Sequence, residues 1–329
     1  MNGADRRVAM GGAEMACPVP DPHPRPEKVD DTAGPEPSAG PLVGIDVGGT
    51  KVDIAILVDG ERRTRRIPTE ADRGAAHVVD RALSTAAALA DGAVAAVGVA
   101  VPGAVGNGVI RLADNVPGLD ELDLPSLVED VFPGAPLALV NDLNAAAAAQ
   151  LAAGVVPRQG VGLVVGLGTG TAAGIVVDGV LRPGARGAAG EIGYSRVPAG
   201  DADGALVRLE EFAGGRAFDR LAASVGLTGA QELLDRAKVD PEVAAVVLPR
   251  LDAVGRAITF CQHVLDADAV VVFGGLSAHP LLRARVEKAL NDELADPPAV
   301  RWLPPDRNAS LDGALHHAAL AARSRPVSA

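Results

Sequence analysis

Two glycine-rich segments have residue types suited to binding phosphate. The first covers residues 46–51 (DVGGTK), and the second, in the other half of the 329-residue chain, covers residues 166–171 (GLGTGT). Glycines let the backbone approach a phosphate closely, while backbone N–H groups, threonine hydroxyls and Lys51 supply donors and charge. Asp46, which ends an apolar run, could hold Mg²⁺ directly or through water. Either segment alone could be an ordinary hairpin turn, but one in each half of the chain favours phosphate binding.

Asp142 is a candidate general base. It stands in the segment VNDLN (residues 140–144), at a predicted strand-to-helix junction. An Asp at such a junction is commonly the N-cap of the helix, so its position alone favours capping. Asn144 could cap the helix instead, which would leave Asp142 free to take a proton from a hydroxyl that attacks a phosphoryl group.

Further polar residues lie among small ones. Glu191 is part of GAAGEIGY (residues 187–194), and Glu210 follows downstream. Carboxylates beside small side chains suit a pocket in which sugar hydroxyls donate hydrogen bonds, although this composition could simply reflect a chain rich in Gly and Ala. Asn115 opens NVPG (residues 115–118), an ordinary turn whose amide could bind a hydroxyl.

The strands and helices predicted around these residues occur in the same order in both halves of the chain. Apolar runs bounded by Gly, Pro or Asn predict strands, and longer Ala- and Leu-rich segments predict helices. In the first half we expect strands over 42–47, 52–58, 93–101 and 137–140, and helices over 77–89 and 144–153. In the second half we expect strands over 162–165, 173–177 and 270–273. This repetition predicts two α/β lobes that face a cleft, with the glycine turns at its edge.

Composition excludes several classes of protein. A formal net charge of −12 argues against a general binder of nucleic acid or anionic membranes. Two cysteines cannot form a disulfide framework, and no uninterrupted apolar stretch is long enough to span a membrane. We therefore expect a cytoplasmic protein. Residues 1–40, rich in Pro, Gly and Asp, are expected to be a disordered tail, or in part to precede the true start codon.

Taken together, the motifs resemble those of ROK-family sugar kinases. The similarity covers about residues 42–322 and rests on the order of many segments rather than on any single one. They are DVGGTK (46–51), VPG (101–103), NVPG (115–118), NDLNAAA (141–147), GLGTGTAAG (166–174), GARGAAGEIG (184–193), FGG (273–275) and DRNASLDGAL (306–315).

The resemblance implies an α/β protein with the two-lobed, actin-like ATPase (ribonuclease H-like) fold and an active site in the interlobe cleft. The N-terminal lobe would comprise residues 41–140 together with a C-terminal helix at about 312–329. The C-terminal lobe would comprise residues 141–311. A helix over 311–322 should return to the N-terminal lobe.

The same resemblance implies roles for individual residues. Asp142 matches the catalytic base, and Asp46 is the residue associated with Mg²⁺. Positions matched to ATP and its phosphates are Gly48, Gly49, Thr50, Lys51, Gly168, Thr169, Gly170, Gly274 and Gly275. Positions matched to the sugar are Asn115, Asn141, Glu191, Tyr194 and Glu210.

One departure from the family pattern concerns zinc. Many members carry a His followed by a CxCGxxGC segment next to the sugar pocket. Here Tyr194 stands where that His is expected, and residues 195–209 contain neither Cys nor His. Ligand chemistry therefore predicts that this chain has no zinc site. In the zinc-bearing members that His also touches the sugar, so the resemblance implies that the choice of substrate could differ here.

We expect an ATP- and Mg²⁺-dependent kinase that phosphorylates the primary, 6-position hydroxyl of a hexose or hexose-like sugar, with glucose as the default. An amino sugar such as kanosamine or glucosamine, a C7-cyclitol, and polyphosphate as donor stay open. A homodimer is implied by resemblance alone. The family also contains repressors with a DNA-binding helix-turn-helix domain ahead of the core. The Pro-rich residues 1–40 and the intact Asp142 favour an enzyme over such a repressor or a binding-only relative.

Overall fold

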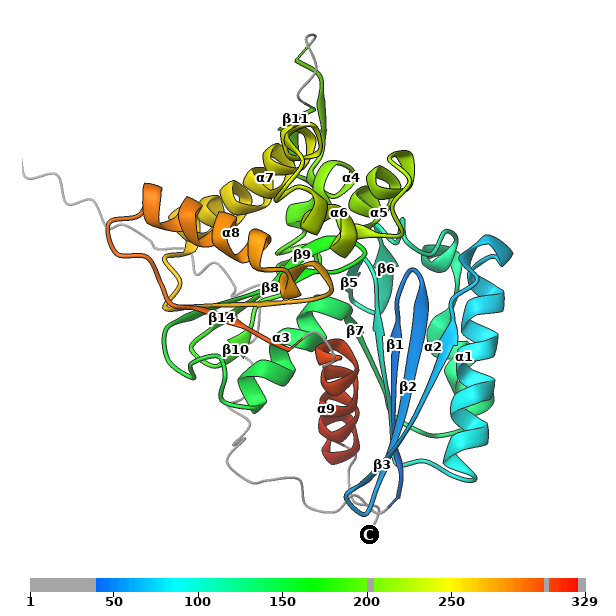
Figure 1. Ribbon diagram of the computed structural model, residues 1–329. Helices are drawn as coiled ribbons and strands as arrows, with labels where there is room; N and C mark the ends of the chain where they lie inside the picture. Colours follow the sequence, from blue (N-terminus) through cyan, green and yellow to red (C-terminus); the bar gives the residue numbers. More distant parts are fainter. Residues whose placement is uncertain (1–39, 200–203, 305–307, 325–329) are drawn as a thin grey trace, which may run out of the picture. The chain divides into compact units, whose positions relative to one another are not determined.

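The computed structural model describes residues 40–199, 204–304 and 308–324 (Figure 1). The predicted tail therefore lies outside the described residues, apart from Gly40, and so does the end of the predicted C-terminal helix. Within them, two five-stranded sheets are formed, one from each half of the chain.

The first sheet has the strand order β3-β2-β1-β4-β7. Its strands are β1 (Leu42–Val47), β2 (Lys51–Val58), β3 (Glu61–Pro68), β4 (Ala96–Val101) and β7 (Leu137–Asn141). The pairs β1–β2 and β2–β3 are antiparallel, whereas β1–β4 and β4–β7 are parallel. β1 and β4 are apolar and buried because both of their faces are covered, while the edge strand β3 is polar and almost wholly exposed.

The second sheet repeats this arrangement with the order β10-β9-β8-β13-β14. Its strands are β8 (Val161–Leu167), β9 (Thr171–Val177), β10 (Val180–Leu181), β13 (Ala269–Phe273) and β14 (Val300–Trp302). The pairs β8–β9 and β9–β10 are antiparallel, and β8–β13 and β13–β14 are parallel. The repetition expected from the sequence is thus present, and each sheet also contains strands that were not predicted: β3 in the first, β10 and β14 in the second.

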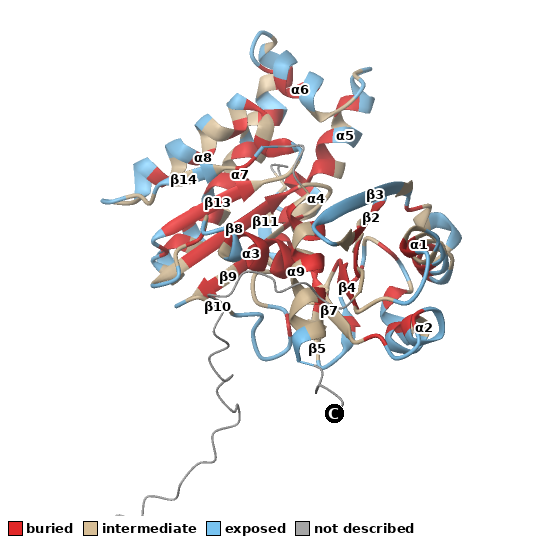
Figure 2. Ribbon diagram, turned by 90° about the horizontal axis from the view of Figure 1, so that it is seen from below, coloured by how far each residue is buried: buried red, intermediate tan, exposed pale blue. Residues whose placement is uncertain are grey.

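Helices cover the outer faces of the sheets. α1 (Ala75–Ala90) and α2 (Leu124–Val131) enclose one core with β1, β2 and β4. α4 (Leu209–Ala213), α5 (Gly215–Ser224), α6 (Ala230–Arg236), α7 (Pro241–Leu265) and α8 (Pro280–Glu293) enclose a second core with β8, β9 and β13. Figure 2 shows these buried layers in red beneath exposed outer helix faces.

Two helices, α3 (Asp142–Ala152) and α9 (Ala309–Arg323), pack against each other and against the inner faces of the sheets (Figure 1). Alternation along each strand explains why α9 comes so close. Ile54 and Ile56 face the α1 side, whereas Ala55 faces α9. A Cβ added at Gly98 would lie 1.9 Å from the carbonyl oxygen of Ala314, so only glycine fits there. The helix expected over 311–322 is therefore present and contacts the first sheet.

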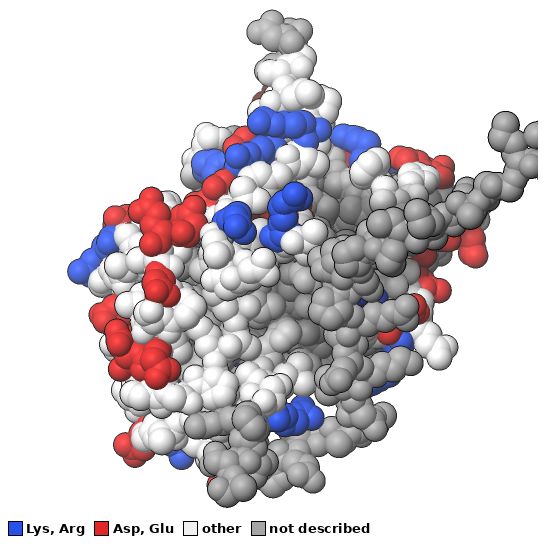
Figure 3. Space-filling model, turned by 180° about the vertical axis from the view of Figure 1, so that it is seen from behind, with Lys and Arg blue, Asp and Glu red and all other residues white. Residues whose placement is uncertain are grey.

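Shorter elements complete the described chain. They are β5 (Ala104–Gly106), β6 (Val109–Arg111), β11 (Arg196–Pro198), β12 (Leu206–Arg208) and the 3-10 turns η1 (Ala71–Arg73), η2 (Leu119–Glu121), η3 (Ile192–Tyr194) and η4 (Leu276–Ala278). No helix of the described residues is long and apolar enough to cross a membrane. On the face seen from behind, acidic side chains lie towards both edges, and several basic ones lie near the top (Figure 3).

Candidate active site

A cavity of about 810 Å³ is lined by residues from both sheets. This volume is within the range of small-molecule binding sites. All the candidate residues named from the sequence border it: Asp46, Gly48, Gly49, Thr50, Lys51, Asn115, Asn141, Asp142, Gly168, Thr169, Gly170, Glu191, Tyr194, Glu210, Gly274 and Gly275. The structure thus brings together residues that are far apart in the chain, while their individual roles stay predictions.

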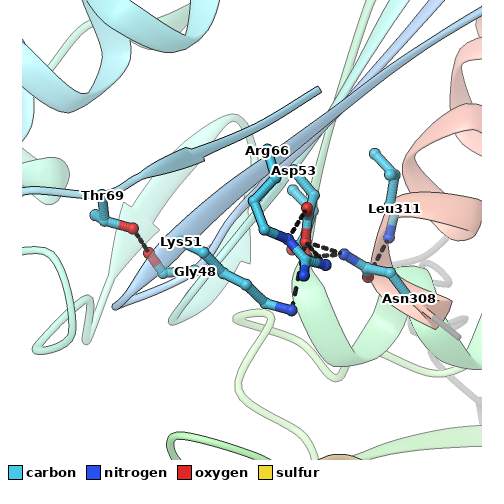
Figure 4. Close-up of polar contacts among 8 residues, drawn as sticks. Gly48, Lys51, Asp53, Arg66, Thr69, Asn308 and Leu311 are labelled. Atoms are coloured by element: carbon cyan, nitrogen blue, oxygen red, sulfur yellow. Dashed lines mark hydrogen bonds and ion pairs between the residues drawn. The ribbon is translucent and has the colours of Figure 1, made fainter. Parts of the chain in front are cut away.

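The first glycine turn joins β1 to β2 and has a fixed backbone. The N–H of Gly48 donates to the carbonyl oxygen of Lys51 at 2.9 Å, and the Thr69 hydroxyl donates to the carbonyl oxygen of Gly48 at 2.6 Å (Figure 4). The N–H of Thr69 also donates to the carbonyl oxygen of Thr50 at 3.1 Å. The turn therefore keeps its shape through contacts within the protein.

Two carboxylates behind this turn share one amide donor. The Asn308 amide nitrogen donates to Oδ2 of Asp46 at 3.0 Å and to Oδ2 of Asp53 at 2.7 Å. Asp53 also accepts from Arg66 at 2.6 and 3.1 Å and forms an ion pair with Lys51 at 3.5 Å (Figure 4). Burial would raise the pKa of Asp53, but the hydrogen bond from Arg66 and the neighbouring cations outweigh it, so the pKa is lowered.

Asp46 has the opposite electrostatic balance. Burial, joined by the charge of Asp53, raises the pKa of Asp46 to about 6, although the hydrogen bond from Asn308 opposes the shift. Mg²⁺ prefers oxygen ligands and usually takes one or two protein carboxylates together with phosphates and water. Among the described residues, no group of three His, Cys, Asp or Glu could hold a metal. Asp46 beside the first glycine turn therefore fits Mg²⁺ bound jointly with a donor phosphate, rather than in a cage made by the protein.

The junction of β7 and α3 holds Asp142 in a defined orientation. Oδ1 of Asn141 accepts from the N–H of Asn144 at 2.9 Å, so Asn141 is the N-cap. Capping by Asp142, which its position favoured, and capping by Asn144, the alternative, are therefore both wrong. The Asn141 amide donates to the carbonyl oxygen of Gly103 at 2.8 Å and to Oδ1 of Asp142 at 3.1 Å. Oδ1 of Asp142 also accepts from the N–H of Leu143 at 2.8 Å. Oδ1 is thus held by the protein, and Asp142 still borders the cavity.

Burial raises the pKa of Asp142 to about 8, and the charges of Asp46, Glu191 and Glu210 contribute, while the N–H of Leu143 opposes the shift. The pKa of Glu191 is raised to about 7, first by burial and then by the charges of Glu210 and Asp114. A general base works best when its pKa is close to the operating pH. The environment of Asp142 therefore suits it to exchange a proton near neutral pH.

A cluster of three side chains links the two halves of the chain on the Glu191 side of the cavity. The Tyr194 hydroxyl donates to Oδ2 of Asp114 at 3.1 Å and to the carbonyl oxygen of Leu112 at 3.2 Å. Arg208 donates to the same Asp114 oxygen at 2.6 Å, and its guanidinium carbon lies 4.4 Å from the centre of the Tyr194 ring. Burial and the hydrogen bond to Asp114 raise the pKa of Tyr194 well above its ordinary value.

The second glycine turn joins β8 to β9 and rests on Glu210. Oε2 of Glu210 accepts from the N–H of Thr171 at 3.0 Å. Nearby, Gly274 follows β13 with a φ of +107°, and a Cβ there would lie 2.4 Å from the carbonyl oxygen of Leu167. The ends of β8 and β13 can approach each other only because this residue is glycine.

Several side chains that line or brace the cavity were not singled out from the sequence. They are Asp53, Arg66, Asp114, Arg208, Arg216 and Asn308. Asn308 lies in the DRNASLDGAL segment and Asp114 directly precedes NVPG, so both could have been found through their motifs. The three arginines lie outside any such motif. Only the folded chain brings Arg66 and Arg216 to the cavity, and Arg208 to Asp114.

Comparisons with known proteins identify the family of this chain. The model of the ROK family matches residues 42–323. The chain belongs to the ROK family. It is 31% identical over 255 residues to a kanosamine kinase from Amycolatopsis mediterranei, covering 72% of this chain and 80% of the relative. It is 26% identical over 260 residues to an N-acetylmannosamine kinase from Haemophilus influenzae, covering 76% and 85%, respectively.

A solved structure of a ROK family glucokinase from Streptomyces griseus, in complex with glucose and AMPPNP, is 25% identical. It superposes with a TM-score of 0.69 over 85% of this chain and 99% of that chain. The predicted fold class is thus confirmed: this ROK protein has the two-lobed, actin-like ATPase fold. The three relatives named here are sugar kinases.

Proposed function

We propose that this ROK protein transfers the terminal phosphoryl group of ATP to the primary, 6-position hydroxyl of a hexose or hexose-like sugar. The observation that carries the proposal is the placement of Asp142. Its carboxylate is oriented through Oδ1 by Asn141 and Leu143, and it borders the same cavity as both glycine turns. A hydroxyl beside it would be deprotonated within reach of the phosphate donor.

In the transfer, the ionised Asp142 accepts the proton of the sugar hydroxyl. The hydroxyl oxygen forms a bond to the terminal phosphorus of ATP, the bond from that phosphorus to the bridging oxygen breaks, and ADP leaves. The backbone of the two glycine turns and Lys51 face the negative charge of the transferring group. Mg²⁺ held at Asp46, when bound, neutralises charge on the donor phosphates.

Carboxylates and the cluster of Tyr194, Asp114 and Arg208 provide recognition of the sugar. Glu191 and Asn115 form hydrogen bonds with ring hydroxyls, and Glu210 holds the β8–β9 turn through the N–H of Thr171. Asn141 uses its amide on Gly103, Asp142 and Asn144, so it acts mainly by positioning the base.

Glucose is the default acceptor, and an amino sugar is the second candidate. Two features support the amino sugar: the kanosamine kinase relative, and the acidic groups Glu191, Glu210 and Asp114, which lie together at one part of the cavity. An ammonium group on the substrate would pair with these carboxylates.

The test is a coupled assay of ADP release with MgATP and a panel of acceptors. The panel contains glucose, mannose, glucosamine, kanosamine, N-acetylmannosamine and a valiolone-type cyclitol. The proposal expects sugar-dependent ADP release on at least one acceptor, abolished in Asp142→Asn. Sugar binding without any turnover, with ATP or with polyphosphate, would contradict it.

A further inference from the structure

Arg216 lies between the two glycine turns and is attached by its backbone to the second. It is the second residue of α5, whose first two N–H groups point at the β8–β9 turn. The N–H of Gly215 donates to the carbonyl oxygen of Gly168 at 3.0 Å, and the N–H of Arg216 donates to that of Thr169 at 3.3 Å. These two hydrogen bonds attach the start of α5 to the second glycine turn.

The side chain of Arg216 extends from there to the first turn. Nη2 donates to the carbonyl oxygen of Gly49 at 2.8 Å, and Nη1 donates to Oδ1 of Asn115 at 3.0 Å. A Cβ at Gly49 would lie 2.6 Å from Nη2, so the glycine is what lets the guanidinium come so close. Arg216 thus connects the two predicted phosphate-binding turns, which come from different halves of the chain.

Arg216 differs from the other cationic side chains at the cavity because its charge is not paired with a carboxylate. Lys51, Arg66 and Arg216 are the Lys and Arg residues among its lining residues. Lys51 and Arg66 both pair with the carboxylate of Asp53. Arg216 contacts only a carbonyl and an amide oxygen, and within the described segments no carboxylate forms an ion pair with it.

A half-buried guanidinium with neutral partners has charge and N–H groups left for an anion. Gly49 and Asn115 occupy only two of its N–H groups. Guanidinium groups bind phosphate through two parallel hydrogen bonds, and such charge-assisted bonds are stronger than neutral ones. The anion that fits between two glycine turns is a phosphate chain.

We propose that Arg216 is a ligand of the terminal phosphates of the donor, and that it couples donor binding to the positions of both glycine turns. This inference rests on the proposed function, because it assumes that a phosphate donor enters the cavity. A phosphate bound by Arg216 would be held by residues of both halves, and the charge that develops during transfer would lie against the guanidinium.

Calorimetric titration of the full chain with inorganic pyrophosphate, and separately with ATP, tests the inference. The variants are Arg216→Gln, Arg216→Lys and the control Arg220→Gln. Arg220 lies one turn further along α5, is exposed, and contacts only the carbonyl oxygen of Glu211. Melting curves establish that each variant is folded.

We expect Arg216→Gln to raise the Kd for pyrophosphate about 10-fold to 100-fold, as for the loss of a charged hydrogen bond. Arg216→Lys, which keeps the charge, should raise it less than Arg216→Gln does, and Arg220→Gln should leave it unchanged. The slope of log Kd against the logarithm of the salt concentration should also decrease in Arg216→Gln, by about the contribution of one charge. A residue that only held the two turns in place would not change this slope.

Equal pyrophosphate affinity and salt dependence in wild type and Arg216→Gln would overturn this inference and leave the proposed function intact. If the wild type binds neither pyrophosphate nor ATP, both fail. Binding by wild type and Arg216→Lys with a loss in Arg216→Gln supports both.

Discussion

Replacing Asp142 by Asn should slow phosphoryl transfer by about 10² to 10⁴-fold and, at the same time, make the folded protein more stable. Burial raises the pKa of Asp142 to about 8 from its ordinary value of 3.8. At pH 7 the folded state therefore binds a proton at this side chain that the unfolded chain does not bind. Asn carries no charge to bury, and its side-chain oxygen can still accept from the N–H of Leu143.

The size and sign of this effect follow from proton linkage. Each pKa unit corresponds to about 1.4 kcal/mol, and about three units separate 3.8 from 7, which gives an upper value of about 4 kcal/mol. Because the folded state binds more protons than the unfolded state between pH 4 and 8, the wild type loses stability as pH rises through this window. The advantage of Asp142→Asn should therefore increase with pH and level off near 8.

Thermal unfolding in EDTA at pH 5.5, 7 and 8 measures this advantage. For a domain of this size, about 2 to 4 kcal/mol corresponds to a Tm increase of roughly 4 to 8 °C. Asp80→Asn, which removes an exposed carboxylate on α1, is the matched control because it changes net charge equally. If Asp142→Asn has a Tm equal to or below that of the wild type, or gains no more than Asp80→Asn at all three pH values, Asp142 is not the buried, destabilised carboxylate described above.

Three further predictions concern activity. First, kcat/KM for the sugar should rise with pH below about 8, up to tenfold per unit, because Asp142 must lose its proton to act as a base; a flat profile from pH 6 to 8 would contradict this. Second, Asn308→Asp should weaken activation by Mg²⁺ several-fold, because it removes the amide donor that Asp46 and Asp53 share. The substitution keeps the side-chain oxygen that caps α9. An unchanged Mg²⁺ titration would exclude a role of Asn308 in the binding of Mg²⁺. Third, Tyr194→Phe should raise KM for the sugar roughly threefold to tenfold and leave KM for ATP within twofold. The reason is the loss of the hydrogen bonds from the Tyr194 hydroxyl to Asp114 and to the carbonyl oxygen of Leu112. Equal changes in both KM values would argue against a role of Tyr194 on the sugar side of the cavity.

Much of the fold could be predicted because its strands are apolar and end at Gly, Pro or Asn. β1 and β8 were expected at nearly their observed limits for this reason. β3 was missed because its sequence, ERRTRRIP, is polar throughout and lies exposed at the sheet edge. Its pairing with β2 depends on backbone hydrogen bonds, which leave no pattern in the side chains.

The candidate site could be predicted to the extent that short motifs mark it. The glycines of both turns, together with Asn141 and Asp142, border the cavity as their motifs predicted. Arg216 could not be found in this way, because its partner Gly49 is 167 positions away and nothing nearby distinguishes it from other arginines. Likewise, capping by Asn141 rather than Asn144 depends on where α3 begins, a boundary that sequence patterns fix only within a few residues.

A single-turnover measurement tests the central claim that Asp142 acts as the base in phosphoryl transfer from ATP to a sugar. Rapid mixing of excess enzyme with MgATP and the preferred acceptor, followed by acid quench, gives the rate of transfer itself. We expect Asp142→Asn to bind both substrates with Kd values close to those of the wild type and to transfer the phosphoryl group about 10² to 10⁴ times more slowly. Transfer by Asp142→Asn within tenfold of the wild-type rate would contradict the account.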